Sequence, residues 1–201
     1  MLDSSLLPAL PYAALIFDCD GTLIDTTAAN ESAWRAALAE WDVELDTTWY
    51  RARTGLPADD LLMELAKETD REFDHAAVRA AALDAYSRLV GTVEPNAPVV
   101  AVARAHHGRV PLAVASGGSR RAVEESLQAT GLRPLFDAVV TRDDVRYGKP
   151  APDVYLLAAE RLKADPALCV AYEDTDEGAA AALAAGIRVI DVRPILGRAT
   201  T

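Results

Sequence analysis

The stretch Ala13-Ala14-Leu15-Ile16-Phe17-Asp18-Cys19-Asp20-Gly21-Thr22 decides the fold of this chain. Its first five residues are a continuous apolar run, which is typical of a buried strand. Two carboxylates, Asp18 and Asp20, follow at the carboxyl end of that strand, and Gly21 permits the chain to turn away sharply. Open α/β sheets bind their ligands at the carboxyl ends of strands, so this stretch predicts a first strand and the position of the chemistry.

Strands and helices alternate in the second half of the chain, from about residue 91 onward. Short apolar runs predict further strands at 110–115, 138–140, 168–172 and 187–191. Apolar residues with a helical period predict helices at 99–106, 120–129, 152–163 and 177–185. This alternation is typical of a parallel, doubly wound sheet, so we predict a Rossmann-like α/β core.

Residues 28–90 have a different pattern, in which helical periodicity continues without a clear strand. Apolar residues recur at helical spacing around 34–41, 62–66 and 78–89. We therefore predict a helical domain at 28–90, inserted into a core made of 13–27 and 91–201. Residues 1–12, which contain two prolines, are predicted to be an irregular leader.

The composition fits a single ordered domain with a small insertion. Of the 201 residues, 51% are apolar, which is enough for a core and argues against disorder. Acidic side chains outnumber basic ones by 31 to 20, which gives a formal net charge of −11. This charge argues against a nucleic acid polymer as partner, because phosphate backbones bind to basic surfaces. A small anionic substrate is compatible with it, since a bound metal ion can reverse the local field.

Neither a secretory signal nor a membrane span is predicted. The N-terminal residues lack a basic segment followed by an apolar one, and no apolar run approaches the ~18–20 residues of a transmembrane helix. Cys19 and Cys169 lie in or beside predicted strands, so we expect reduced, buried thiols rather than a disulfide. These features predict a cytoplasmic protein with no membrane partner.

Polar residues stand at the ends of three predicted strands. Asp18 and Asp20 follow the first, Ser116-Gly117-Gly118-Ser119 follows the next, and Glu173-Asp174 follows a third. Lys149 precedes the helix that leads to the third of these strands. Because parallel strands end at the same edge of a sheet, we expect four carboxylates, a hydroxyl, a lysine and free backbone N–H groups to gather there.

These residue types suit phosphoryl transfer. The four carboxylates repel one another and need a cation, and Mg²⁺ binds carboxylates, water and phosphate oxygens. Ser116 and the N–H groups that begin the next helix can hold an anion, and Lys149 adds a positive charge beside it. One aspartate of the first strand can attack phosphorus and form an aspartyl-phosphate, while the other moves protons.

Each motif has an ordinary alternative when it is taken alone. The two aspartates can form an acidic turn, Ser116–Ser119 a loop with a helix N-cap, and Lys149 a solvated side chain. Glu173-Asp174 can simply favour the start of a helix. Their joint placement at strand ends favours a site. A thiol nucleophile at Cys19 is disfavoured, since no arginine lies six residues downstream.

In order and spacing, Asp18–Thr22, Ser116, Lys149-Pro150 and Glu173-Asp174 resemble the four signature motifs of the haloacid dehalogenase superfamily. The resemblance covers essentially residues 14–193 and implies that the helical insertion is an α-helical C1 cap. Within the superfamily, the chain is similar to the β-phosphoglucomutase-like subgroup, which includes sugar-phosphate phosphatases. The resemblance implies that the cap closes over the site, excludes water and supplies substrate selectivity.

The resemblance also implies a role for each motif residue. Asp18 would be the nucleophile and a Mg²⁺ ligand. Asp20 would be the general acid and base, with its backbone carbonyl on the metal. Asp174 would be a metal ligand, and Glu173 would bind the metal directly or through water.

The phosphoryl group would be held by Ser116, Gly117 and Lys149, and the resemblance places Ser116 and Lys149 among the catalytic residues as well. A second set of candidates lies in the helical cap, where side chains would contact the rest of the substrate. These cap candidates are Asn30, Thr54 and Gly55.

Three positions bear on the reaction type. The presence of Asp20 favours phosphate chemistry, because dehalogenases of the superfamily generally lack this second aspartate. Phosphoglucomutases of the subgroup carry a histidine and an arginine at positions where, by spacing, this chain has Asn30 and Ala58. A mutase must hold a bisphosphate by its far end, so these departures favour a phosphatase acting on a monophosphate. At 55–58 and 169–178 the chain is similar to fructose-1-phosphate phosphatases of this subgroup.

We therefore predict a Mg²⁺-dependent phosphatase that hydrolyses a small phosphorylated sugar or related metabolite through an aspartyl-phosphate. A phosphosugar mutase and a non-catalytic binding protein on the same fold are the alternatives. The sequence leaves the substrate and the oligomeric state open, and a helical cap is compatible with a monomer.

Overall fold

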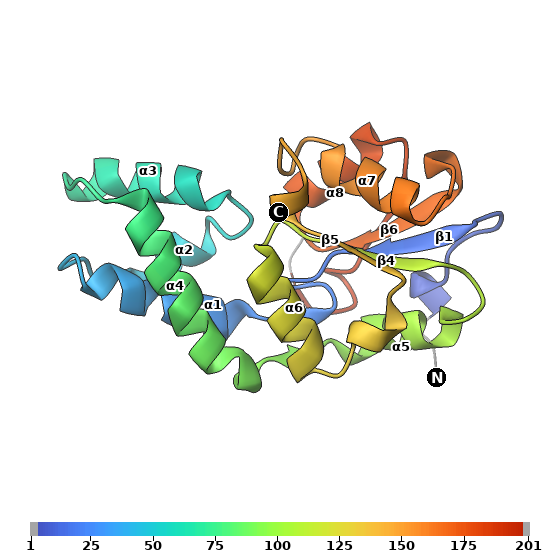
Figure 1. The fold of residues 1–201 in the computed structure, drawn as a ribbon, viewed down its shortest axis with the longest axis horizontal. Coiled ribbons are helices and arrows are strands. Elements are labelled where there is room, and N and C mark those ends of the chain that lie inside the picture. Colours follow the sequence, from blue (N-terminus) through green and yellow to red (C-terminus); the bar gives the residue numbers. More distant parts are fainter. Residues whose placement is uncertain (1–3, 199–201) are drawn as a thin grey trace. The chain divides into compact units, whose positions relative to one another are not determined.

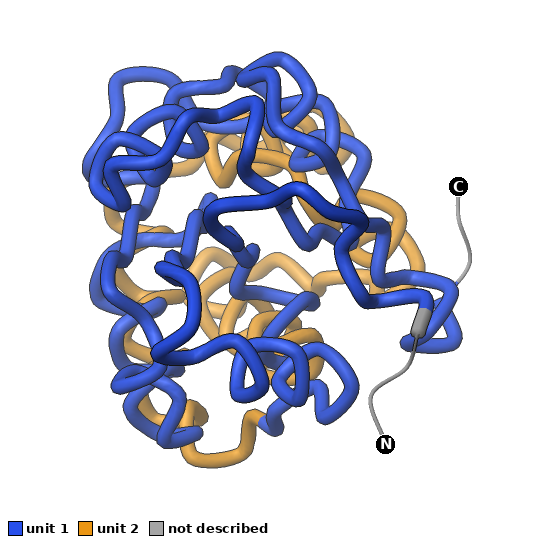
Figure 2. The backbone as a smooth tube through the Cα atoms, turned by 90° about the vertical axis from the view of Figure 1, so that its right-hand side faces the viewer, with its two compact units in different colours: residues 1–25, 94–201 blue, residues 26–93 orange. Residues whose placement is uncertain are grey.

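The computed structural model describes residues 4–198 and divides the chain into two compact units. The described parts of 1–25 and 94–201 form the first unit, and 26–93 form the second; Figure 2 colours them blue and orange. Of the predicted leader, residues 1–3 lie outside the described residues. The next residues form a 3₁₀ turn, η1 (Ser4–Leu6), and the Tyr172 hydroxyl donates a hydrogen bond to the Leu6 carbonyl at 2.8 Å.

A five-stranded parallel sheet forms the centre of the first unit, in the order β5-β4-β1-β6-β7. Its strands are β1 (Ala14–Phe17), β4 (Leu112–Ala115), β5 (Ala138–Val140), β6 (Cys169–Glu173) and β7 (Arg188–Asp191). β1 lies in the middle, with Leu15 opposite Leu112 of β4 and Val170 of β6. The predicted α/β fold with a parallel sheet is confirmed.

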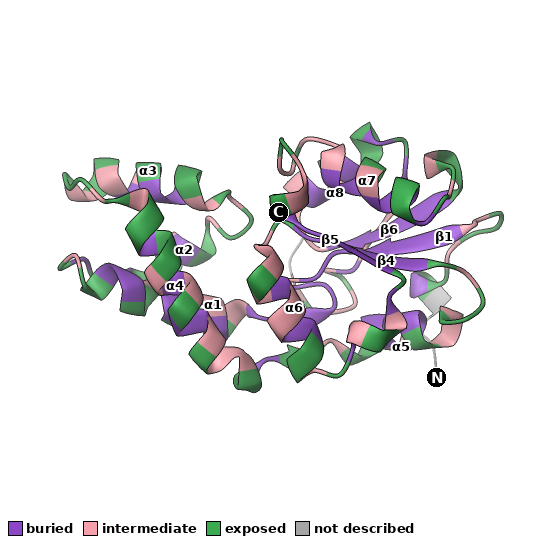
Figure 3. Ribbon diagram, in the orientation of Figure 1, coloured by how far each residue is buried: buried purple, intermediate pink, exposed green. Residues whose placement is uncertain are grey.

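Helices lie on both faces of this sheet. Figure 1 shows α7 (Asp153–Arg161) and α8 (Asp176–Ala184) over one face, with α5 (Ala97–His106) and α6 (Arg120–Ala129) toward the other. Successive strand side chains alternate between faces. Ala14 and Ile16 therefore join the apolar cluster of α7 and α8, whereas Phe17 stacks on Tyr172 with ring centroids 4.6 Å apart. β1, β4, β5 and β6 are buried along their whole length, as Figure 3 shows, which explains why their sequences are largely apolar; β7, at the edge of the sheet, is partly exposed.

Several predicted strand boundaries differ from the structure by one or two residues; for example, β7 begins at Arg188 rather than at residue 187. The strand predicted at 110–115 begins only at Leu112, and the strand predicted at 168–172 extends through Glu173. Glu173 stays in the sheet because it pairs with Asp191 of β7, and its carbonyl accepts a hydrogen bond from the N–H of Val192 at 2.9 Å. The glutamate is therefore fixed by the ladder rather than carried on a loop.

A small ribbon lies where the chain leaves and re-enters the first unit. β2 (Ile24–Asp25) pairs antiparallel with β3 (Glu94–Pro95), and the sequence pattern predicts neither strand. Strands of two residues are too short to produce a detectable alternation of polar and apolar residues. Asn96, next to the ribbon, donates from its side chain to the carbonyls of Gly21 and Thr22 at 2.8 and 3.0 Å.

The second unit is helical, as its sequence pattern predicts. It contains α1 (Thr27–Ala39), α2 (Thr47–Arg51), α3 (Ala58–Thr69) and α4 (His75–Leu89). α1 and α4 lie side by side, and a buried apolar cluster that includes Leu38, Leu62 and Val78 joins the helices. The sequence pattern misses α2, because five residues complete little more than one helical turn. Across residues 4–198, we find no helix with the length and apolar character that crossing a membrane requires.

Candidate active site

The turn after β1 brings Asp18 and Asp20 to the carboxyl end of the sheet's central strand. Gly21 has a φ of +85°, a conformation that favours glycine, and its N–H donates to the carbonyl of Ile24 at 2.8 Å. A Cβ at this position would overlap the carboxylate of Asp174. Glycine is therefore required for two reasons: the backbone turns into the left-handed region, and the side chain of Asp174, the residue after β6, packs directly against it.

Lys149 bridges two of the predicted site carboxylates. Its Nζ donates to Oδ1 of Asp18 at 2.7 Å and also to Oε1 of Glu173. The lysine side chain is 10% exposed, and the side chains of Asp18 and Glu173 are 7% and 1% exposed. The buried hydroxyl of Tyr155, on α7, donates to the same Oε1 at 2.8 Å. Residues 131 positions apart in the sequence thus form one buried, charge-assisted network.

Glu173 and Asp174 are held by different sets of donors. The second oxygen of Glu173, Oε2, accepts from the backbone N–H groups of Asp174 and Thr175 at 3.0 and 3.2 Å, and from the Thr175 hydroxyl at 3.1 Å. Asp174 accepts from the hydroxyl of Thr22 at 2.9 Å and from Arg198 at 3.0 Å. Both carboxylates are therefore fixed in orientation before any ligand binds.

Ser116 follows β4 and lies beside the second aspartate of the β1 turn. Its hydroxyl donates to Oδ2 of Asp20 at 3.3 Å and accepts from the N–H of Gly118 at 2.9 Å. Gly117, between them, is exposed. Ser119 caps α6 by accepting from the N–H of Ala122 at 3.3 Å, so the loop ends at a helix N-terminus. This arrangement offers N–H groups and a hydroxyl to an anion.

Burial and neighbouring charges shift the ionisation of this cluster. Burial raises the pKa of Asp18 well above its usual value, Lys149 opposes that shift, and Glu173 and Asp174 add to it. The pKa of Asp174 is raised to about 6, first by burial and then by Glu173, against the hydrogen bond from Thr22. Burial lowers the pKa of Lys149, but Asp18 and Glu173 outweigh it, so the pKa of the lysine is raised. Asp18, Glu173 and Asp174 therefore still repel one another, because the single charge of Lys149 does not cancel theirs.

The residues present fit a divalent cation. One carboxylate oxygen from each of Asp18, Glu173 and Asp174 lies within 4.8 Å of the others. Such hard oxygen donors are the ligands that Mg²⁺ and similar ions prefer, and a cation would relieve the repulsion among the three acids. The carboxylate of Asp20 is outside this set and contacts Ser116 instead; its backbone carbonyl as a metal ligand stays a prediction.

The three cap candidates belong to the helical unit. The side-chain amide of Asn30, on α1, donates to the Thr26 hydroxyl at 3.1 Å. Thr54 and Gly55 are exposed in the segment after α2, where the Thr54 hydroxyl donates to the carbonyl of Arg51 at 3.0 Å. Their contact with a substrate stays a prediction.

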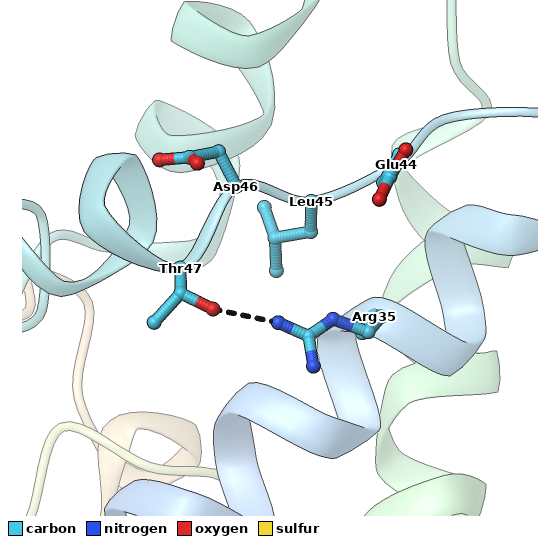
Figure 4. A pocket seen from close by; sticks show the side chains of 5 residues that line it. All are labelled: Arg35, Glu44, Leu45, Asp46 and Thr47. Carbon is cyan, nitrogen blue, oxygen red and sulfur yellow. Dashed lines mark hydrogen bonds between the residues drawn. The ribbon is translucent and has the colours of Figure 1, made fainter.

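The helical unit also contains a pocket of its own, which Figure 4 shows from close by. Arg35 crosses it and donates to the hydroxyl of Thr47 at 2.8 Å. The full lining consists of Arg35, Glu44, Leu45, Asp46 and Thr47. No residue predicted to be functional lines this pocket, so it is separate from the candidate site.

Sequence reasoning missed four residues that hold the acidic cluster in place. Thr22 lies in the first motif but had no assigned role, and Thr175 precedes a predicted helix in the manner of an N-cap, a signal that could have identified it. Tyr155 was hidden on the apolar face of its helix, and Arg198 lies beyond every motif. For these last two, only the tertiary contact reveals the connection with the site.

Comparison with known proteins finds similar sequences over most of the chain. Residues 12–186 match the family model described as haloacid dehalogenase-like hydrolase. The chain is 40% identical over 183 residues to fructose-1-phosphate phosphatase YqaB of Escherichia coli (strain K12), covering 90% of this chain and 97% of that protein. It is 32% identical to validoxylamine A 7'-phosphate phosphatase of Streptomyces hygroscopicus subsp. limoneus, covering 88% of this chain and 83% of that protein.

Solved structures have the same fold. The crystal structure of CbbY from Rhodobacter sphaeroides in complex with phosphate superimposes with a TM-score of 0.79 and 26% sequence identity. The superposition covers 89% of this chain and 85% of that chain. The similarity therefore extends over nearly the whole length of both proteins.

Proposed function

Because the chain belongs to the haloacid dehalogenase-like hydrolases, we propose that it is a phosphatase of a small phosphorylated sugar or related metabolite. The observation that carries this proposal is the different environment of the two aspartates after β1. Asp18 contacts Lys149, whereas Asp20 contacts Ser116. One carboxylate thus lies in a buried cationic environment, and the other lies beside a hydroxyl at the entrance to a helix.

Asp18 acts as the nucleophile in this proposal. Its carboxylate oxygen forms a bond to phosphorus as the bond between phosphorus and the ester oxygen breaks, which gives an aspartyl-phosphate. Burial alone would favour the protonated, unreactive acid, and the Lys149 ammonium at 2.7 Å opposes this effect. The lysine therefore favours the ionised form of the nucleophile, against the effect of burial, and positions it.

Asp20 moves the protons. It donates one to the oxygen of the departing alcohol, then accepts one from the water that attacks the aspartyl-phosphate. That attack releases inorganic phosphate and restores the Asp18 carboxylate. The contact with the Ser116 hydroxyl at 3.3 Å orients Asp20, and this hydroxyl also faces the N–H of Gly118.

The phosphoryl oxygens are bound by Ser116, the N–H of Gly117 and Lys149. The start of α6 supports them, because a helix N-terminus presents unpaired N–H groups and a positive dipole end to an anion. Fixed donors of this kind stabilise charge as it develops on the transferred group, which is the main requirement of phosphoryl transfer.

We propose Mg²⁺ as the divalent cation of the cluster, held by Asp18, the Asp20 carbonyl and Asp174, with Glu173 as a direct or water-mediated ligand. When bound, it supplies neutralisation of the phosphoryl charge. Glu173 also has a role of its own, because its Oε1 shares the Lys149 ammonium with Asp18 and so limits how far the lysine can move.

A monophosphate of a sugar or polyol is the substrate class that the relatives support. The two relatives described above are named for fructose 1-phosphate and validoxylamine A 7'-phosphate, both phosphate esters of small polar molecules. Asn30 and Ala58 stand where a mutase would need a base and a second phosphate anchor, which favours hydrolysis over isomerisation. We assign substrate contacts to Asn30, Thr54 and Gly55 of the helical unit.

The test measures inorganic phosphate released from sugar phosphates, polyol phosphates and nucleotides in the presence of Mg²⁺. We expect hydrolysis of at least one sugar or polyol monophosphate, no isomerised sugar phosphate among the products, and loss of activity on chelation that Mg²⁺ reverses. Release of isomerised sugar phosphate would instead establish the mutase.

The variant Asp18→Asn tests the covalent mechanism. Because the amide is not a nucleophile, we expect turnover to fall at least about 10³-fold. Circular dichroism should report an unchanged fold, and a phosphorylated protein should be trapped after acid quench in wild type alone. Substantial turnover by a folded Asp18→Asn protein contradicts the aspartyl-phosphate.

A further inference from the structure

Arg198 connects the last described segment of the chain to the acidic cluster. Its Nη1 donates to the carbonyl of Gly21 at 2.8 Å and to Oδ2 of Asp174 at 3.0 Å. Its Nη2 lies 3.6 Å from Oδ1 of Asp25. The arginine side chain is 30% exposed and that of Asp174 is 11% exposed, so solvent screens their interaction only in part.

The guanidinium of Arg198 therefore contacts a carboxylate that is itself a candidate metal ligand. Asp174 is one of the three acids whose oxygens lie within 4.8 Å of one another. Lys149 contacts the other two members, Asp18 and Glu173. Arg198 thus places a second positive charge at the opposite member of the cluster, on the acid that the lysine does not touch directly.

A fixed positive charge has opposite effects on the two ligands that a phosphatase must bind. It repels a divalent cation that shares Asp174, and it attracts the phosphate dianion that binds afterwards. The same charge also limits how strongly the acidic cluster repels the anionic substrate. A residue that only supported the fold would affect both ligands in the same direction.

We propose that Arg198 is a positioning residue that, through Asp174, weakens the affinity of the site for Mg²⁺ and strengthens its affinity for phosphate. This inference rests on the proposed function. The arginine contacts both the Gly21 carbonyl and the Asp174 carboxylate and so holds this carboxylate in place. Its charge also makes the site less negative, first for the cation and then for the phosphate.

The experiment measures the two affinities without turnover. Mg²⁺ is titrated into metal-free protein at pH 8 by isothermal titration calorimetry, and inorganic phosphate is then titrated into the Mg²⁺-saturated protein. For Arg198→Met, we expect the dissociation constant for Mg²⁺ to fall and that for phosphate to rise, each about tenfold. Arg198→Lys keeps the charge, so both constants should stay within about threefold of wild type.

Arg188→Met is the matched control, because it removes the same charge from the opposite end of the sheet. Arg188 begins β7 and donates to the carbonyls of Ala9 and Pro11, and we expect both constants to stay at wild-type values. If wild type binds Mg²⁺ and hydrolyses phosphate esters, but Arg198→Met binds Mg²⁺ more weakly than wild type or equally well, this inference is overturned and the proposed function stands. Absence of Mg²⁺ binding by wild type overturns the proposed function with it.

Discussion

At the residue scale, the separation of Asp18 and Asp20 by one buried residue determines what each can do. Both leave the same strand, yet Asp18 is 5% exposed and contacts the ammonium of Lys149, while Asp20 is partly exposed and contacts a hydroxyl. Cys19 between them is fully buried, and burial raises the pKa of its thiol well above the usual value. A raised thiol pKa disfavours the nucleophilic thiolate, which agrees with the proposal that the two carboxylates are the reactive groups of this turn.

The variant Asp20→Asn tests the proton-transfer role at this scale. An alkoxide leaving group needs a proton and a nitrophenolate does not, so the loss should depend on the leaving group. We expect kcat/KM to fall by roughly 10²–10⁴ for a sugar phosphate and by less than about tenfold for p-nitrophenyl phosphate. The measurement compares the two substrates in wild type and variant. Equal losses for the two substrates would exclude Asp20 as the general acid. Asp18→Asn is the comparison: because the nucleophile is needed for every substrate, this variant should lose activity equally with both.

At the element scale, the junction of β6 and α8 determines the position of Glu173. Its carboxylate is held by two backbone N–H groups and by the Thr175 hydroxyl, and Thr175 also caps α8 by accepting from Gly178 at 3.1 Å. Gly178 lies directly against the Glu173 carboxylate, which a Cβ at this position would overlap. The first turn of α8 thus packs directly against the side chain of Glu173 and fixes its position.

We therefore expect Gly178→Ala to destabilise the protein, although alanine has the higher helix propensity. In an ordinary helix, this substitution adds about 1 kcal/mol of stability. Here the added methyl group must displace a buried carboxylate, and we expect a loss of about 1–3 kcal/mol in the free energy of unfolding, measured with urea. We also expect lower kcat/KM, because Glu173 positions Lys149. The control Gly91→Ala has open space around it and should be neutral or slightly stabilising. A stabilised Gly178→Ala protein would contradict this account of the junction.

At the scale of the whole molecule, a second ionic cluster connects elements of the core away from the acidic site. Asp144 accepts from the N–H and hydroxyl of Thr141 at 2.8 and 2.9 Å and from Arg161 at 3.1 Å, and it pairs with Arg120. It thereby joins the end of β5 to the first residue of α6 and the last residue of α7. Burial raises the pKa of Asp144, but these donors outweigh it and lower the pKa to about 2.

This cluster makes stability depend on pH in the acid range. The folded pKa of about 2 is below the usual value of 3.8, so the unfolded chain takes up the proton first as the pH falls. The stabilisation is complete above about pH 4 and is lost as the pH falls toward 2. We expect Asp144→Asn to lower the free energy of unfolding at pH 7 and to flatten its decline between pH 4 and pH 2. Urea titrations at several pH values measure this, with Glu125→Gln of the exposed Arg121 pair as the control. An unchanged slope would show that Asp144 is not linked to acid unfolding.

The sequence by itself determined the elements and the chemistry types of this protein. Buried parallel strands must be apolar on both faces, so β1, β5 and α6 could be located closely from periodicity. Polar residues that directly follow such strands stand out against this background, and the rule that parallel strands end at one edge predicted that Asp18, Ser116 and Glu173-Asp174 would gather. Short segments such as α2 and the β2–β3 ribbon were missed, because too few residues remain to show a period.

Only the tertiary structure decided how the site is held together and which charges touch. The contacts of Lys149 with Asp18, of Tyr155 with Glu173 and of Arg198 with Asp174 join residues that are far apart in the sequence. Local periodicity reports which face of an element is buried, but it does not record which distant group completes a buried charge. A buried carboxylate must find its donors wherever the fold brings them. The first motif therefore indicated the reaction type from the sequence, and contacts from distant segments of the chain fixed the electrostatics of the site.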